Sequence, residues 1–156
     1  MKKKSLMATV ILFIAASSSF AAGKVTAVGI FGSFMGSTTG STGGGIGLSI
    51  KMGSFPVLGL QYNLAGAGSM ALSCDYYLVD SEAVAGPLTW FLGVGAFGGI
   101  SFESGSSFDF GLRAPIGLQL WPIKKCEFYG SLVPILHLLP TPSPRIGAEL
   151  GFRIHL

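Results

Sequence analysis

The stretch from 108 to 120, FDFGLRAPIGLQL, alternates between two kinds of residue at every step. The even-numbered positions carry Phe, Leu, Ile and Ala, whereas the odd-numbered positions carry Asp, Gly, Arg, Pro and Gln. A period of two places successive side chains on opposite faces of an extended strand. The stretch therefore predicts a β-strand with one bulky apolar face and one face that is small or polar.

The same alternation recurs along most of the chain. It is clear in the segments 45–53, 57–64, 70–78, 88–97 and 145–156. Two further segments are less regular. The segment 25–34 is apolar on both faces, and 127–138 contains Pro134, which predicts a bulge or a weakly paired stretch there. Together these make eight predicted strands, an even number that is typical of bacterial single-chain membrane barrels. The residues between them, including 80–87, are expected to be turns and loops.

The start of the chain has the three regions of a secretory signal peptide. Three lysines at 2–4 are followed by an apolar run at 6–16 and by Ser-Phe-Ala at 19–21, which places small residues before a cleavage site. The apolar run is shorter than the roughly 20 residues that a transmembrane helix needs. We therefore expect residues 1–21 to be removed after export and residues 22–156 to form one barrel domain.

The charge content argues against both a soluble domain and a nucleic-acid partner. Charged residues make up 11% of the chain, against about 25% in ordinary soluble domains. The formal net charge of +3 is due to the three signal-peptide lysines, because the remaining basic and acidic residues are equal in number. The chain has no basic patch of the kind that phosphate binding requires.

The size of the side chains indicates which face of the barrel is buried. Eight strands enclose an interior just wide enough to be filled by side chains. The bulky apolar face would overfill that interior, whereas the Gly- and Ser-rich face fits it. A closed barrel also pairs every backbone group, as lipid requires. We therefore predict an all-β fold, an eight-stranded antiparallel up-and-down transmembrane β-barrel surrounded by the lipid of the outer membrane. The alternative is a soluble secreted or periplasmic barrel.

Charged residues inside the predicted strands fall on the odd-numbered face, four of each sign. They are Lys51, Asp75, Asp109, Arg113, Glu127, Arg145, Glu149 and Arg153. Because an unpaired buried charge is very costly, we expect these residues to pair with one another in the lumen, with Arg153 close to Glu127 on the neighbouring strand. A side-chain-filled lumen is the main prediction, and a polar pore is the alternative.

Aromatic residues and cysteines support further expectations. Trp90, Phe128 and Phe152 fall near the periplasmic ends of their strands and predict an aromatic girdle at the membrane interface, with ordinary apolar packing as the alternative.

Cys74 and Cys126 could form one disulfide after export. They lie on segments that are not expected to be neighbours, so we do not expect them to be bonded.

The chemically suggestive motifs do not predict an enzyme. Residues 93–98 match G-x-G-x-x-G, but no helix follows, so the glycines are interpreted as relief of crowding in the lumen. His137 and Glu149 could act as a base and its orienting acid, which leaves a membrane-embedded lipid-modifying hydrolase as an alternative. No Ser closely follows His137, and His155 has no partners at metal-ligand spacing. We therefore predict no catalytic residue, no cofactor and no metal.

The second half of the chain resembles a family of small, largely uncharacterised outer-membrane barrels, known mainly from spirochaetes and OmpA/OmpX-like in size. The resemblance is carried by DYYL at 75–78, FLGVGA at 91–96, GLRAPIGL at 111–118 and the segment 147–153, which ends in Gly-Phe-Arg. It implies membrane insertion by the barrel-assembly machinery through the C-terminal strand, with adhesion as a candidate role. It implies no agreed activity and identifies no host or surface ligand. The family usually closes with aromatic residues, whereas Ile-His-Leu stands at 154–156 here.

Overall fold

The computed structural model describes residues 25–37, 42–64, 68–102 and 107–156. They form nine antiparallel strands, which are β1 (Ala27–Ser37), β2 (Thr42–Lys51), β3 (Val57–Asn63), β4 (Ser69–Ala85), β5 (Leu88–Ser101), β6 (Ser107–Arg113), β7 (Ile116–Ile123), β8 (Cys126–Leu139) and β9 (Ser143–His155). The predicted signal peptide lies outside the described residues. No helix in the described ranges is long and apolar enough to span a membrane.

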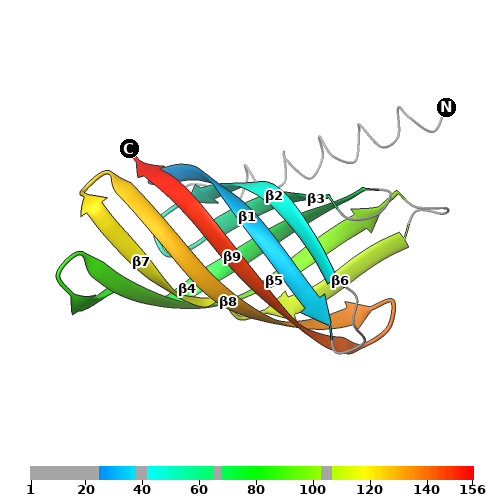
Figure 1. Cartoon of the computed structure of the whole chain (residues 1–156). Coiled ribbons are helices and arrows are strands. Elements are labelled where there is room, and N and C mark those ends of the chain that lie inside the picture. Colours follow the sequence, from blue (N-terminus) through cyan, green and yellow to red (C-terminus); the bar gives the residue numbers. More distant parts are fainter. Residues whose placement is uncertain (1–24, 38–41, 65–67, 103–106) are drawn as a thin grey trace.

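The strands close into a ring. β1 pairs with β2 on one side and with β9 on the other, so the first and last strands complete the wall (Figure 1). β6 and β7 share one position in the ring, because both lie between β5 and β8 with continuous register. The nine elements therefore build an eight-stranded antiparallel up-and-down barrel, which confirms the predicted fold.

A proline divides the strand that the sequence predicts at 108–120. Pro115 has no N–H to donate to the sheet, and β6 ends before it while β7 begins after it. The neighbouring strands still bridge the break, since Ala114 N donates to Pro134 O at 3.0 Å and Gly93 N donates to Pro115 O at 2.7 Å. Of the two alternatives expected at Pro134, the bulge is absent, because β8 passes through this residue without a change of register. The weakly paired stretch is present on one side, since Val133 and Pro134 have no register partner on β6 or β7.

The hairpin of β4 and β5 is longer than predicted. The prediction of a loop at 80–87 is wrong, because β4 continues to Ala85 and only a tight turn at 86–87 separates it from β5. Gly86 has a φ of 54°, which glycine adopts without strain. Register shifts follow Tyr77 and Val79, so the regular alternation of faces ends in this part of β4.

The register of the pairs sets the stagger of the barrel. Direct partners lead round the ring through Ala27, Lys51, Val57, Asp75, Gly95, Arg113, Ile135, Arg145 and Ser37. One circuit that starts at Ala27 thus returns to β1 ten residues further along, at Ser37. Such a stagger requires the strands to tilt by about 35–45° from the barrel axis. The tilt brings residues from non-adjacent strands to the same level inside the barrel.

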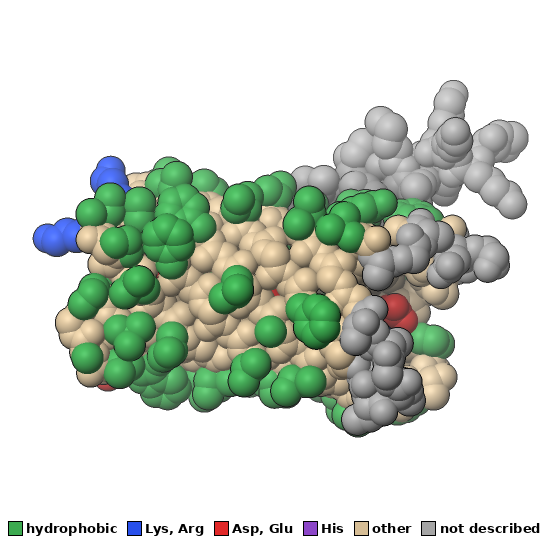
Figure 2. All heavy atoms as spheres, viewed as in Figure 1, with side chains coloured by type: hydrophobic (Ala, Val, Ile, Leu, Met, Phe, Trp, Pro, Cys, Tyr) green, Lys and Arg blue, Asp and Glu red, His purple; other side chains and the backbone are tan. Residues whose placement is uncertain are grey.

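The distribution of side chains is the reverse of that in a soluble protein. Thirty large apolar residues are exposed on the described surface, whereas only eight hydrophobic residues are buried beside nine polar or charged ones. Figure 2 shows apolar side chains spread over the visible wall, with backbone and small residues between them and charged side chains mainly at the two ends. Where the register is regular, odd-numbered strand residues face the lumen and even-numbered residues face outward, as the alternation predicts. The exceptions lie beyond register shifts, in the last part of β4 and at the ends of β7 and β8, where Ile123 and Leu139 are exposed.

Candidate functional site: the charged lumen

Glycines in the wall allow ion pairs to form across an intervening strand. Asp75 on β4, Gly95 on β5 and Arg113 on β6 are direct partners in register. A Cβ on Gly95 would lie 2.8 Å from the Asp75 Cα and collide with its carboxylate. With no side chain there, Asp75 Oδ1 lies 3.1 Å from Arg113 Nε, an ion pair too bent to count as a hydrogen bond. Arg113 Nη2 also donates to Glu149 Oε1 at 2.9 Å.

Arg153 is the most connected charge in the lumen. It lies directly opposite Glu127 on β8, and its Nη1 donates to Glu127 Oε1 at 2.7 Å. On the other side it reaches past Gly29, where a Cβ would lie 2.8 Å from the Arg153 Cγ, and its Nε donates to Ser49 Oγ at 2.9 Å. Its Nη2 donates to Tyr77 Oη at 3.3 Å. One guanidinium therefore ties β9 to β8, β2 and β4.

Glu127 has several partners besides Arg153. Its side chain is fully buried, and Gln119 Nε2 donates to its Oε1 at 3.0 Å. Its Oε2 lies 2.7 Å from His155 Nε2, and the His155 ring packs 4.6 Å from the ring of Trp121. These contacts satisfy both carboxylate oxygens, which a buried charge requires. The predicted network did not include four of the residues that contact Glu127 or Arg153. They are Ser49, Tyr77, Gln119 and His155, and their odd numbers would have assigned them to the lumen.

The predicted equality of lumen charges does not hold for the described residues. Lys51 Nζ pairs at 2.7 Å with Asp80 Oδ1, and the sequence placed Asp80 in a loop. This adds a fifth acid against four bases. Asp109 and Arg145 take part in none of the ion pairs formed within the described ranges. The Arg145 guanidinium instead contacts Met35 Sδ at 3.9 Å.

An aromatic cluster fills the lumen beside the Arg153 network. Tyr77 stacks on Phe91 with a centroid distance of 4.8 Å, and Phe91 meets Tyr129 edge to face at 6.3 Å. The Tyr129 ring lies 3.9 Å from the Arg153 guanidinium carbon, a cation–π contact. Phe91 is 1% exposed, so this layer is closely packed. Each ring lies over an inward-facing glycine on the next strand, as Tyr77 does over Gly93.

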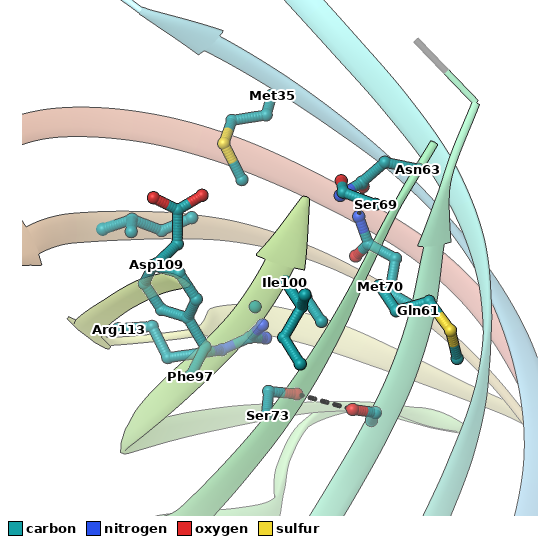
Figure 3. A pocket seen from close by; sticks show the side chains of 14 residues that line it. Met35, Gln61, Asn63, Ser69, Met70, Ser73, Phe97, Ile100, Asp109 and Arg113 are labelled. Atoms are coloured by element: carbon teal, nitrogen blue, oxygen red, sulfur yellow. Dashed lines mark hydrogen bonds between the residues drawn. The ribbon is translucent and has the colours of Figure 1, made fainter. Parts of the chain in front are cut away.

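A cavity of about 70 Å³ occupies the other half of the lumen, away from the end that carries Ala27 and the C-terminus. Figure 3 shows Asp109 on one side of it and Asn63 and Ser69 on the other, with Phe97 below Asp109 and the Arg113 side chain extending toward the middle. The lumen thus consists of a packed half near the C-terminus and a hollow polar half.

The residues suggested for a hydrolase do not assemble into one. His137 is 4% exposed and faces the lumen against Phe97, with a ring separation of 4.9 Å. Its Nε2 has no hydrogen-bond partner among the described residues, and Glu149 pairs with Arg113 instead. Ser143 is the cross-strand partner of His137, but the two share no hydrogen bond within the described ranges.

The three predicted girdle residues belong to outward-facing positions. Phe128 and Phe152 are direct partners with ring centroids 4.9 Å apart, and Trp90 lies on β5 opposite Leu118. Phe55 and Tyr76 form a second outward pair at the same end, 5.7 Å apart. The opposite end also has exposed aromatic residues that the prediction omitted, namely Phe34, Tyr62, Phe102 and Phe108. Their even numbers are the signal that would have identified most of them.

The two cysteines lie on different strands of the barrel. Cys74 on β4 and Cys126 at the start of β8 are both free thiols. The described ranges contain no group of three or more His, Cys, Asp or Glu side chains placed to hold a metal ion.

Two solved β-barrel structures have the same architecture as this chain. The N-terminal β-barrel domain of OprF from Pseudomonas aeruginosa matches with a TM-score of 0.55 and 14% identity, covering 84% of this chain and 100% of that domain. Neisserial surface protein A matches with a TM-score of 0.52 and 13% identity, covering 85% of this chain and 96% of that protein. Neither a protein-family model nor a curated protein matches the sequence. The chain therefore shares the fold of small eight-stranded outer-membrane barrels, while the narrower family suggested by its motifs stays a prediction.

Proposed function

We propose that this protein is a small integral protein of the bacterial outer membrane with a structural or surface-interaction role. The observation that carries the proposal is the inside-out barrel, with bulky apolar side chains on the outer wall and ion pairs in the lumen. Soluble monomers rarely expose contiguous apolar patches beyond a few hundred Å². The described exterior is apolar around the visible wall, as lipid contact favours (Figure 2).

The aromatic residues at the two ends support the same orientation. Trp90, Phe128 and Phe152 stand with Tyr76 near the end that carries the C-terminus, and a second group lies toward the opposite end. Membrane barrels carry such girdles where the apolar band meets the lipid headgroups. We infer that these two groups mark the two interfaces of one bilayer. The end that carries the start of β1 and the C-terminus then faces the periplasm.

The packed half of the lumen supports a closed barrel rather than a channel. Arg153, Glu127 and the aromatic cluster fill it with side chains that are 0–5% exposed. A conducting pore needs a continuous water-filled path, and eight strands leave little width for one. The role that fits is therefore anchorage or contact at the cell surface rather than bulk diffusion.

Export and assembly complete the proposal. The signal peptide in residues 1–21 directs secretion, and the barrel-assembly machinery engages the C-terminal strand β9 during insertion. Neisserial surface protein A is, by its name, a surface protein, and it has this fold, which supports a surface role here.

Cell fractionation with gel electrophoresis tests the proposal. The full chain, expressed with its own leader, is expected in the outer-membrane fraction with Ala22 as its first residue. A closed barrel should resist dodecyl sulfate at room temperature, so the unboiled and boiled samples should migrate differently. Recovery in the soluble periplasmic fraction would overturn the membrane assignment. An intact Met1 in membrane-extracted protein would overturn the signal peptide.

A further inference from the structure

The cavity in the hollow half of the lumen has room for a small ligand. Its volume is about 70 Å³, whereas one water needs roughly 10–15 Å³ of such space. The walls carry both polar and apolar side chains, with Ser69 and Asn63 facing Asp109 across the opening in Figure 3. The space therefore suits a few waters or one compact polar solute.

The charges of this half favour a cation. Arg113 is neutralised twice, by Asp75 at 3.1 Å and by Glu149 at 2.9 Å. Asp109 lines the cavity and takes part in none of the ion pairs among the described residues. Arg145 is the second arginine in this half, so among the described residues three carboxylates face two arginines there, beside the imidazole of His137. One negative charge is left to be balanced, and burying it unbalanced is costly.

The remaining lining can recognise N–H donors. Gln61 Nε2 donates to Asn63 Oδ1, and Asn63 Nδ2 donates to Ser69 Oγ at 2.7 Å. These bonds use amide donors of the two side chains and leave acceptor oxygens, such as Gln61 Oε1, for a ligand. Phe97 adds an aromatic ring to the lining, and such a ring attracts a cation held over its face.

We propose that this cavity binds a small organic cation of the primary ammonium or guanidinium class, with Asp109 as its counter-ion. The inference goes beyond the proposed membrane role, because the cavity lies inside the lumen and does not depend on contact with lipid. It can be tested on folded protein in detergent, so its failure would leave the membrane assignment untouched.

The test measures thiol modification at Ser69→Cys in a Cys74→Ser/Cys126→Ser background. The reagents are 2-aminoethyl methanethiosulfonate, a cation, and 2-sulfonatoethyl methanethiosulfonate, an anion, each normalised to its rate with the unfolded variant. We expect the cationic reagent to react about fivefold faster or more, because the uncompensated carboxylate attracts it. Asp109→Asn should remove that preference. Methylguanidinium chloride should slow the reaction more than the same concentration of sodium chloride.

Two controls keep the outcome interpretable. Ser131→Cys lies in the lumen at 7% exposure, away from the cavity lining, and should resist both reagents as long as the barrel is folded. Asn63→Cys provides a second reporter if Ser69→Cys does not fold, as judged by the shift between unboiled and boiled samples. Equal normalised rates, a preference that survives Asp109→Asn, or no protection by methylguanidinium would each overturn the proposal. So would a folded protein that neither reagent modifies.

Discussion

Replacing Arg153 by Leu should destabilise the barrel through the acid that it leaves behind. Arg153 is 2% exposed and donates to Glu127, Ser49 and Tyr77. Leucine fills part of the same volume but offers none of these bonds. Glu127 is fully buried, so its charge would lose the nearest cation without gaining access to water.

The expected loss in the free energy of unfolding depends on the hydrogen bonds that Glu127 keeps in the variant. Breaking a buried ion pair by removing one partner costs about 3–5 kcal/mol. Glu127 keeps hydrogen bonds with Gln119 at 3.0 Å and with His155 at 2.7 Å, which favours the lower part of that range. We therefore expect Arg153→Leu to lower the free energy of unfolding by about 3 kcal/mol.

The assay is equilibrium urea unfolding in lipid vesicles, followed by tryptophan fluorescence. The double variant Arg153→Leu/Glu127→Leu removes both charges, and replacing an ion pair by apolar side chains is often close to neutral. It should therefore recover at least about 1.5 kcal/mol of the loss, a coupling typical of residues in contact. If Arg153→Leu cost less than about 1 kcal/mol, or if the double variant recovered nothing, the lumen network would not be the stabilising element inferred here.

Three further perturbations test other parts of the account. Leu150 is 73% exposed on the outer wall, so Leu150→Arg should cost about 2–4 kcal/mol in vesicles and Leu150→Ala much less; equal costs would speak against lipid contact. Gly95→Ala should cost about 1–3 kcal/mol, because its Cβ would collide with Asp75. The matched change Gly98→Ala on the same strand has no contact closer than 3.8 Å and should be far milder. Planar-bilayer recordings should show almost no conductance, and large stable channels would contradict the packed lumen.

Alternation along the sequence was sufficient to predict the ring and its two faces. The period of two in segments such as 108–120 depends only on strand geometry, so it survives the break at Pro115, where the register of both neighbours is unchanged. The pairing of Arg153 with Glu127 follows from the same alternation, because direct partners on adjacent strands share a face.

The assignment of faces by odd and even residue numbers fails where the register shifts. Asp80 has an even number and would face outward on a regular strand. Shifts after Tyr77 and Val79 change which residues face the lumen, and Asp80 turns inward to Lys51. A bulge of this kind leaves little trace in a single sequence, so the fifth lumen acid was missed.

The contacts between side chains on non-adjacent strands could not be predicted from the sequence either. Arg153 reaches Ser49, and Asp75 reaches Arg113, each past a glycine on the strand between them. Such contacts depend on strand order and on the stagger of the closed ring, which alternation does not specify. The interpretation of the glycines at 93–98 as relief of crowding in the lumen fits Gly93 and Gly95, whereas Gly98 has no contact closer than 3.8 Å. The neighbours of these glycines could be named only from the fold.

The most direct test of the central claim asks what surrounds the outer wall. In a Trp90→Phe/Trp121→Phe background, Leu150→Trp leaves one indole on the outward face in the middle of β9. Vesicles of phospholipid with brominated acyl chains should quench its fluorescence strongly, and aqueous acrylamide should quench it little. The Trp90→Phe variant leaves only Trp121, whose Nε1 donates to Thr89 on the lumen side, and brominated chains should quench it much less. Quenching of the Leu150→Trp indole by acrylamide but not by brominated lipid would contradict a membrane-embedded barrel.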